Sequence, residues 1–394
     1  MDGVDRLSQL PDEIFLQILS KIDDGKSIHR ICSLSKQWLK LPDSFTQDFV
    51  YDGRDTEEEY YTNRFTYYDS RQRYLHHMQA ALLAEIRKAA KVGKLEYTYK
   101  VSQKERLFQD DLFKLARDRH VQCLILHAYS RARGCLSYHG PSCLRKFTSL
   151  TTLHLTNFCF DLEDPEFPRV LVLVTIRSLV LVDCVIRGEF GCDFSTCWPN
   201  LEELQMVGCR FQGFKEMQVK VLCGSKLAKL TMESNKFGPG TEISGDGVKW
   251  FRFVQQFTLH QVLPELKLQS LEHAEVDVSY HIRRDPTLEL NLNELICLMW
   301  RDEEDQDDCR TQVCLSLFDL LRGLGNAEFL SLSPATVQVL SEVPAGLVED
   351  QPSLFRRLKC LKLEGNLISS VQQEIPDEVK TFLLRDCPSA TLIY

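Results

Sequence analysis

Apolar residues recur along most of this 394-residue chain in one spacing, which can be written apolar-x-x-apolar-x-apolar. Copies start at residues 121, 150, 176, 201, 227 and 254, at intervals of 29, 26, 25, 26 and 27 residues. A near-constant period of this length predicts a repeat architecture in which each repeat supplies one strand. Because side chains alternate along a strand, the apolar residues should point into the core and the intervening residues outward.

The spacing is the sequence signature of leucine-rich repeats. Later copies start at Leu271, Ala327, Leu358 and Val379, so the interval falls to 17 residues and then rises to 56. One or two degenerate repeats could lie between residues 276 and 327, where we expect the acidic run Asp302–Asp308 to form an exposed loop. About ten stacked repeats predict an α/β fold: a solenoid with a curved parallel sheet and helices or irregular turns on its outer face.

The first 45 residues follow a different, helical pattern. Pro11 suits the first position of a helix, and Ile14, Ile18 and Ile22 then form one apolar stripe. A second helical pattern ends near Trp38. A unit of roughly 35 residues is too small to bury a core of its own, so the stripe should dock on another surface.

Three motifs carry a resemblance here: Leu10-Pro11-Asp12-Glu13-Ile14, Ile18-Leu19-Ser20 and Leu34-Ser35-Lys36-Gln37-Trp38. The segment resembles the F-box of plant proteins, and with the repeats nearly the whole chain resembles the plant F-box/LRR group. The resemblance implies three short helices that bind a Skp-type adaptor and, through it, a cullin-RING ubiquitin ligase. The adaptor-binding residues it implies are Leu10, Pro11, Ile14, Ile18, Leu19, Ile22, Leu34 and Trp38. The alternative from pattern alone is a helical pair packed against the rest of the chain.

These patterns divide the chain into three parts. Residues 1–45 form the expected F-box, residues 46–93 a connector with one helix, and residues 94–394 the repeat domain. Within the connector, apolar periodicity predicts a helix over residues 75–92. A second helix is predicted over residues 105–117, just before the first repeat.

Composition narrows the choice of partner and compartment. The net charge of −9 argues against a nucleic-acid backbone as the main partner. No apolar run is long enough to span a bilayer, and the amino terminus lacks a secretory pattern. Fifteen cysteines without a C-x-x-C pair predict free, packed thiols in a reducing compartment. We therefore expect a cytoplasmic or nuclear protein without a membrane partner.

No catalytic or metal-binding motif stands out in the sequence. Cys192 with Cys197 and Cys309 with Cys314 lack the further ligands that a zinc site requires. Three residues past the last apolar residue of a repeat lie Cys184, Cys209, Asn235, Asn366 and Cys387. The resemblance to leucine-rich-repeat proteins implies that this is a turn position, where Asn or Cys pairs with backbone groups. The chain is expected to be a non-catalytic subunit without a cofactor.

The outward residues of the repeats are the expected working surface. A client protein would bind this concave face, and the acidic character of its middle suggests a basic client segment. The candidate client-binding residues are Glu203, Gln205, Lys229, Glu233, His260, Glu275 and Asp277. The predicted function is a substrate receptor of a Skp-cullin-F-box ubiquitin ligase. The alternative is a repeat scaffold that binds a Skp-type adaptor outside a ligase; a third hypothesis, an enzyme with its site among the loops, lacks a cluster of suitable residues.

Overall fold

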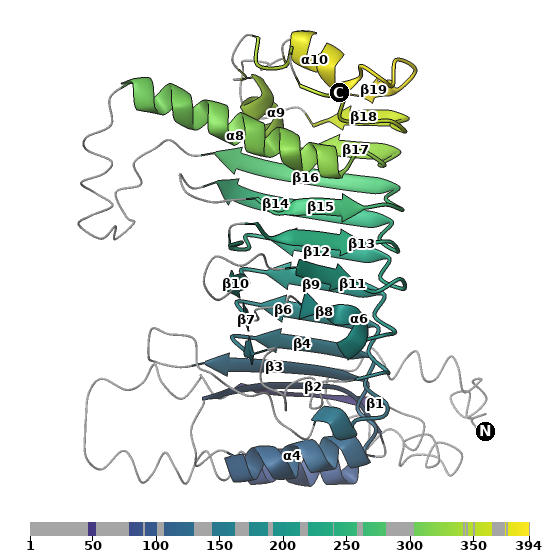
Figure 1. Ribbon diagram of the computed structural model, residues 1–394. Coiled ribbons are helices and arrows are strands. Elements are labelled where there is room, and N and C mark those ends of the chain that lie inside the picture. Colours follow the sequence, from purple (N-terminus) through teal and green to yellow (C-terminus); the bar gives the residue numbers. More distant parts are fainter. Residues whose placement is uncertain are drawn as a thin grey trace, which may run out of the picture. The chain divides into compact units, whose positions relative to one another are not determined.

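The computed structural model divides the chain into two compact units, Met1–Phe158 and Cys159–Tyr394, which are described separately (Figure 1). The predicted F-box, including all eight adaptor-binding residues, lies outside the described residues. The described residues are 46–52, 79–89, 91–100, 106–129, 144–161, 173–187, 192–212, 220–238, 240–257, 263–280, 303–341, 343, 346–349, 351–364, 375 and 377–393.

The first unit contains a parallel sheet of four strands. In spatial order they are β1 (Thr46–Asp52), β2 (Lys91–Lys100), β3 (Cys123–Tyr129) and β4 (Thr152–Thr156). The register aligns Leu95, Leu124 and Leu153 in one buried row. The repeats predicted at residues 121 and 150 are therefore confirmed as parallel strands with their apolar positions inside.

Helical segments connect the strands of the first unit. Residues 79–88 are helical and precede β2, and α4 (Arg106–Asp118) confirms the helix predicted over residues 105–117. A short 3-10 turn, η2 (Leu144–Lys146), precedes β4. The stretch predicted to be a connector also contains β1, and the boundary placed at residue 93 falls inside β2. The repeat spacing was recognised only from residue 121 onward, so the pairing of β1 with β2 and of β2 with β3 was not predicted.

The second unit is built around a parallel main sheet. Its strands lie in the order of the chain, each paired with the next. They are β6 (Ser178–Val182), β9 (Glu203–Val207), β12 (Lys229–Glu233), β14 (Trp250–Phe257), β16 (His273–Tyr280), β17 (Phe329–Leu332), β18 (Cys360–Leu363) and β19 (Thr391–Ile393).

The apolar positions of the repeat form continuous buried rows in this unit. The register aligns Leu179, Leu204 and Leu230, and the row continues through Phe251 and Ala274. These side chains are at most 1% exposed. Full burial of one such leucine or phenylalanine contributes about 1.5–3 kcal/mol, so the aligned rows are the main source of stability. The parallel arrangement agrees with the predicted leucine-rich-repeat solenoid.

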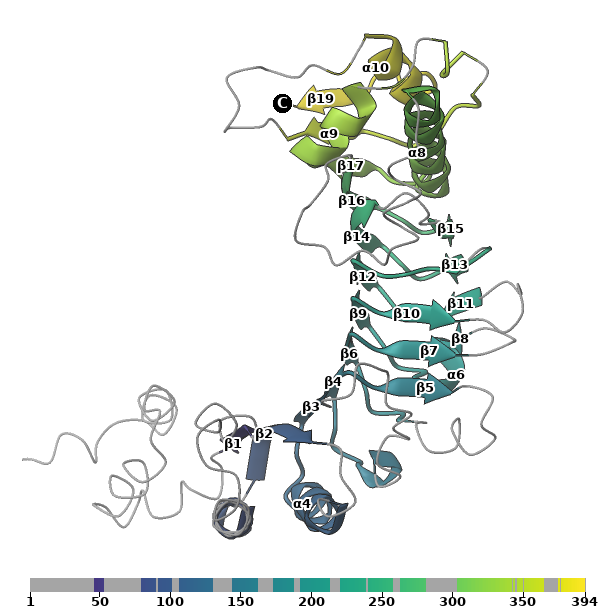
Figure 2. The same cartoon turned by 90° about the vertical axis from the view of Figure 1, so that its left-hand side faces the viewer.

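On the opposite side of the second unit, the described residues form mainly short strands (Figure 2). One small parallel sheet contains β5 (Cys159–Asp161), β7 (Val185–Arg187) and β10 (Arg210–Gln212). Another contains β8 (Cys192–Asp193), β11 (Lys220–Cys223), β13 (Glu242–Gly245) and β15 (Glu265–Leu268), with α6 (Phe194–Cys197) directly after β8. The longer helices among the described residues of this unit lie in the later repeats: α8 (Glu303–Gly323), α9 (Pro334–Ser341) and α10 (Asp377–Leu383).

The strand of the sixth predicted repeat lies six residues earlier than expected. Lys229 pairs with Trp250 and Leu230 with Phe251, so the buried residues are Val248, Phe251 and Phe253. The sequence fits the repeat spacing in both registers, and pairing with β12 selects the earlier one. The sixth repeat therefore starts at residue 248 and not at 254. Its distances from the neighbouring starts at 227 and 271 become 21 and 23 residues, in place of the irregular 27 and 17.

Two other expectations about the late repeats need correction, and the structure bears on one question that the spacing left open. Strand β17 pairs directly with β16, so no repeat strand is inserted between these two in the main sheet. Residues 303–308 of the acidic run begin helix α8 and do not form a loop. The repeat predicted at Val379 is helix α10, and the strand beside β18 is β19. Around Val379, helical and strand spacing coincide over a few residues, and the neighbouring elements decide between them.

The turns directly after β4, β6, β9 and β12 use a left-handed backbone position. The φ angles of Asn157, Asp183, Gly208 and Ser234 are 64°, 51°, 64° and 52°. In the second unit, the residue after each of these left-handed positions is Cys184, Cys209 or Asn235. All three are fully buried, in agreement with their predicted place in the turn. Of the other two predicted members, Asn366 lies outside the described residues. Cys387 is buried but follows helix α10, where its Sγ donates to the Phe355 carbonyl at 3.5 Å.

Candidate functional site

The candidate site is the face of the second unit's main sheet that points away from the core, here called the open face. Its side chains alternate with the buried rows, and the strand register places them in three rows. The first row contains Glu203, Lys229, Trp250, His273, Phe329 and Cys360. The second contains Gln205, Thr231, Arg252, Glu275, Ser331 and Lys362. The third contains Val207, Glu233, Val254 and Asp277.

Aromatic rings occupy the middle of the first row. The Lys229 Nζ lies 4.9 Å from the centroid of the Trp250 ring, within cation–π range. The rings of His273 and Phe329, on the next two strands, have centroids 5.3 Å apart. Trp250 and Phe329 are half-buried and His273 is exposed, so their surfaces are available from the open side.

The second and third rows carry charges. Arg252 Nη1 lies 3.6 Å from Glu275 Oε2, and Lys362 Nζ lies 2.8 Å from Glu364 Oε1, just after β18. The hydrogen bond from Lys362 lowers the pKa of the Glu364 carboxyl, and the same contact raises the pKa of Lys362. Each basic group on these rows therefore has an acidic partner on the face itself.

Helix α9 fixes one end of the open face. Its Thr336 is buried, and its hydroxyl accepts a hydrogen bond from the Val278 N–H at 2.7 Å and donates to the Val276 carbonyl at 3.1 Å. Ser333 accepts from the Thr336 N–H, as a helix N-cap does, and its hydroxyl donates to Asp277 Oδ1 at 2.5 Å. Asp277 is thus held in a defined position on the third row.

Six of the seven candidate client-binding residues lie on the open face. Glu203, Gln205 and Lys229 are exposed, while Glu233, Glu275 and Asp277 are half-buried. His260 lies outside the described residues. Sequence reasoning missed Trp250 and Arg252, because the shifted register of β14 assigned the outward positions to residues 258 and 260. The missed signal was a second copy of the repeat spacing, formed by the apolar residues Val248, Phe251 and Phe253.

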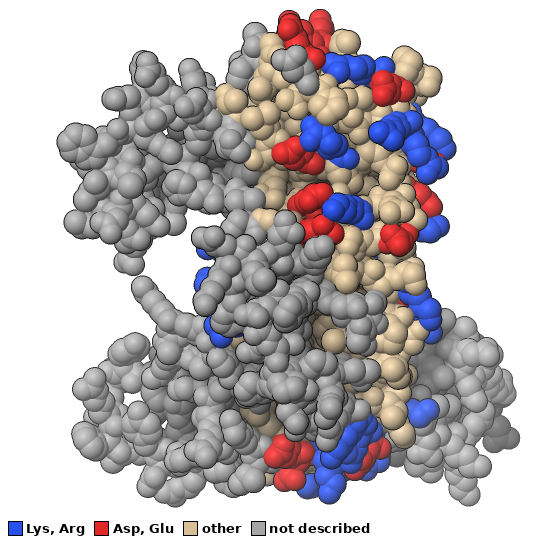
Figure 3. All heavy atoms as spheres, in the orientation of Figure 1, with Lys and Arg blue, Asp and Glu red and all other residues tan. Residues whose placement is uncertain are grey.

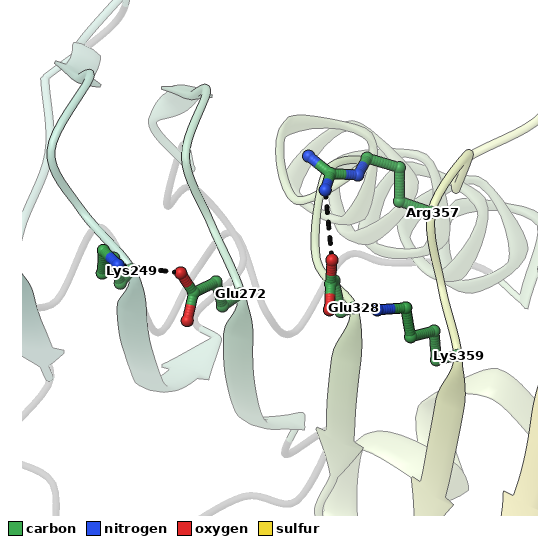
Figure 4. A network of polar contacts seen from close by, with 5 residues as sticks. All are labelled: Lys249, Glu272, Glu328, Arg357 and Lys359. Atoms are coloured by element: carbon green, nitrogen blue, oxygen red, sulfur yellow. Dashed lines mark hydrogen bonds and ion pairs between the residues drawn. The ribbon is translucent and has the colours of Figure 1, made fainter.

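Ion pairs line the edge where the strands of the main sheet begin (Figure 4). Lys249 pairs with Glu272 at 3.0 Å, and Glu328 pairs with both Arg357 at 3.1 Å and Lys359 at 2.6 Å. The Lys359 hydrogen bond lowers the pKa of Glu328. Ion pairs this exposed contribute little stability. Within each pair the opposite charges neutralise one another, so this edge of the sheet is neither strongly acidic nor strongly basic.

Figure 3 views the second unit from the side of α8 and of the sheet containing β8, β11, β13 and β15. On its visible coloured part, acidic and basic side chains lie next to each other. Lys267 there contacts Glu242 at 2.7 Å and Glu265 at 3.2 Å. This side therefore offers mixed charge, without the exposed aromatic row of the open face.

In the first unit, two histidines lie together on the outward side of the sheet. The rings of His127 and His154 are 5.3 Å apart, and Thr156 Oγ1 lies 2.8 Å from His127 Nδ1. Burial, followed by the neighbouring His127, lowers the pKa of His154. Glu96 lies 3.7 Å from His127 Nε2. Even so, no group of three or more His, Cys, Asp or Glu residues suited to a metal ion occurs in the described part of the chain.

Several of the described cysteine thiols are buried in the core, among them Cys184, Cys209 and Cys314. Burial raises the pKa of Cys223 to about 12, which keeps it protonated and a poor nucleophile. Cys209 has a lowered pKa, caused first by a hydrogen bond with Cys184, but both thiols are buried beneath the turns. Neither is accessible to a substrate. No described helix combines the length and apolar character needed to cross a membrane.

Comparison with known proteins reveals distant relatives. The chain is 27% identical over 240 residues to one F-box/FBD/LRR-repeat protein of Arabidopsis thaliana and 30% identical over 209 residues to another. These matches span 60% and 51% of this chain but only 47% and 38% of the two relatives. No family model matches the chain. The sequence is thus distantly similar to F-box/LRR proteins, and it spans less than half the length of these relatives.

Proposed function

We propose that this chain is the substrate-receptor subunit of a Skp-cullin-F-box ubiquitin ligase. The observation that carries the proposal is the similarity to two F-box/FBD/LRR-repeat proteins, together with a parallel solenoid on one sheet face of which described side chains such as Glu203, Lys229 and His273 are exposed. Residues 1–45 would bind a Skp-type adaptor through Leu10, Pro11, Ile14, Ile18, Leu19, Ile22, Leu34 and Trp38. The open face would hold the client.

In this role the receptor supplies position and no reacting group. The adaptor would connect it to a cullin-RING scaffold that also carries the ubiquitin-charged enzyme. Holding the client on the same scaffold raises the effective concentration of its lysines near that enzyme, so that transfer becomes effectively intramolecular. Packed thiols such as Cys223 would take no part in the transfer.

The test is immunoprecipitation of the full chain from plant cells in which the proteasome is inhibited. The unchanged chain should bring down a Skp-type adaptor and a cullin. A variant with Ile14→Asp and Ile18→Asp should lose both, because a charge on the apolar stripe opposes its burial against the adaptor. The matched control is Asp23→Ala with Asp24→Ala, which changes the same segment outside the stripe and should retain both proteins.

Two results would contradict the proposal. If the stripe variant retains the adaptor, residues 1–45 do not bind it as proposed. If the adaptor is present and no cullin accompanies it, the chain acts as a repeat scaffold outside a ligase, the alternative considered from the sequence.

A further inference from the structure

We propose that the open face binds an extended client segment that carries arginine side chains, with Trp250 and the neighbouring aromatic residues as its stacking surface. The inference rests on the proposed receptor function and specifies the chemistry of the client. Its evidence is the arrangement of rings and charges on strands β9 to β18.

The aromatic row provides planar surfaces at a regular spacing. Trp250, His273 and Phe329 come from three consecutive strands of the sheet, and paired strands lie about 4.8 Å apart. Lys229 already shows that a cation lies favourably against the Trp250 ring, 4.9 Å from its centroid. A guanidinium group is planar and weakly hydrated, so it stacks on such rings better than an ammonium group does.

The charge balance of the same face favours a basic ligand. From β9 to the residue that follows β18, it carries five carboxylates, on Glu203, Glu233, Glu275, Asp277 and Glu364, and three basic groups, on Lys229, Arg252 and Lys362. All three basic groups are already engaged, with Trp250, Glu275 and Glu364 respectively.

Within the described part of the chain, the remaining carboxylates have no basic partner. Among the described residues, no cation lies within ion-pair distance of Glu203, Glu233 or Asp277, and Asp277 accepts only the Ser333 hydroxyl. Carboxylates accept bidentate hydrogen bonds from arginine, which gives geometric selectivity over lysine. The first row therefore offers stacking, and the first and third rows offer unpaired carboxylates.

An acidic client would find fewer partners on this face. Its carboxylates would have to displace the existing pairs of Arg252 or Lys362, and they would approach Glu233 and Asp277 at unfavourable like-charge distances. A purely aliphatic segment could cover the rings but would bury the unpaired carboxylates without compensation. An arginine side chain can stack on the rings and also form hydrogen bonds with the carboxylates.

The experiment measures binding of short fluorescein-labelled peptides to the full chain by fluorescence anisotropy. The probes are alternating Arg-Ser, Lys-Ser and Glu-Ser peptides of equal length. The Arg-Ser peptide should bind most tightly, the Lys-Ser peptide more weakly, and the Glu-Ser peptide least. Equal affinity for the Arg-Ser and Lys-Ser peptides, or preference for the Glu-Ser peptide, would overturn the proposal.

Two variants separate the stacking surface from the carboxylates. Trp250→Leu should weaken Arg-Ser binding about 2- to 5-fold, and Trp250→Phe should restore most of it, because a ring is retained. Glu203→Gln with Glu233→Gln should weaken it about 3- to 10-fold, since two exposed charge pairs are lost. Circular dichroism verifies that each variant is folded, and the glutamine pair tests the proposal even if the Trp250 variants do not fold.

The matched control changes the same net charge away from the open face. Asp246 and Glu265 are exposed, in the turn after β13 and on β15. Asp246→Asn with Glu265→Gln should leave Arg-Ser affinity unchanged, and an equal loss would show that only overall charge matters. Peptide binding does not involve residues 1–45, so it can fail while adaptor binding holds, and adaptor binding can fail while peptide binding holds.

Discussion

At the scale of single residues, the turns of the second unit depend on a few buried polar groups. Asn235 is fully buried, its Nδ2 donates to the Met206 carbonyl at 3.0 Å, and its Oδ1 accepts from the Cys209 N–H at 2.8 Å. One side chain thus satisfies two backbone groups of the preceding repeat. The sequence predicted this position, because Asn235 lies three residues past Met232, where the repeats it resembles place Asn or Cys.

Asn235→Ala should lower the free energy of unfolding by about 2–3 kcal/mol, because it leaves a buried N–H and a buried carbonyl unpaired. Urea unfolding followed by circular dichroism measures the loss. Asn200→Ala is the control: its Nδ2 also donates to a carbonyl of the neighbouring repeat, that of Val174 at 2.6 Å, but near the surface. Water can replace that bond, so we expect about 1 kcal/mol or less. If both substitutions lower the free energy of unfolding equally, burial of the Asn235 side chain is not the reason for the destabilisation.

Other residue-scale features could not be read from the sequence. Trp250 fits a core position as well as an outward one, since tryptophan is frequent in both environments. Its assignment to the open face depends on its pairing with Lys229 and His273. The same holds for Phe329, whose outward position follows from the pairing of β17 with β16.

At the scale of elements, helix α8 replaces the short strands that cover earlier repeats. It packs against β15, the last strand of the small sheet containing β8, β11 and β13. At its end, a Cβ on Gly323 would lie 2.5 Å from Leu266 Cβ and 2.7 Å from the Leu266 carbonyl oxygen. The close approach to backbone explains why glycine occupies this position in a helix.

Gly323→Ala should destabilise the second unit by about 1–3 kcal/mol, because the added methyl group separates α8 from β15. Hydrogen exchange should show lost protection in α8 and β15. Gly346→Ala provides the control. Its φ is +80°, and a Cβ there would meet nothing within 4 Å, so only the backbone cost of about 1–2 kcal/mol applies and β15 should stay protected. Unchanged protection of β15 in the Gly323 variant would contradict the packing argument.

The element scale also explains why the late repeats were misassigned. The acidic beginning of α8 resembles a solvated loop when only its charge is considered. The segment around Val379 has apolar residues at positions that suit both a strand and one helical turn, and it forms α10. Local spacing does not separate these cases, because three to six residues are compatible with both periods.

At the scale of the whole molecule, the second unit is a stack in which each repeat contacts mainly its neighbours. Stability is then close to a sum of terms within repeats and between neighbours. In the late repeats, Phe382 of α10 is 1% exposed, and its ring centroid lies 5.1 Å from that of Phe318 on α8. This contact joins two helices that cover the stack near β17 to β19.

Phe382→Ala should lower stability by about 3–5 kcal/mol, as expected for removing a buried phenylalanine. Because each repeat is stabilised mainly by its direct neighbours, hydrogen exchange should accelerate most in β17 to β19 and α8. It should accelerate much less in the distant strands β6 and β9. Ile393→Ala, on the same part of the stack but 42% exposed, should cost less than about 1 kcal/mol. Uniform loss of protection along the main sheet would show that the second unit unfolds as a single block.

The sequence by itself determined the repeat, the buried positions of the earlier repeats, the turn residues Cys184, Cys209 and Asn235, and most of the open face, because strand alternation links spacing directly to burial. It also carried the F-box motifs, whose residues lie outside those described. Only the tertiary structure decided the register of β14, the adjacency of β16 and β17, and the helical state of the last segments. These depend on hydrogen bonds between strands far apart in sequence, and no local pattern encodes which of two equally apolar alignments a neighbouring strand will select.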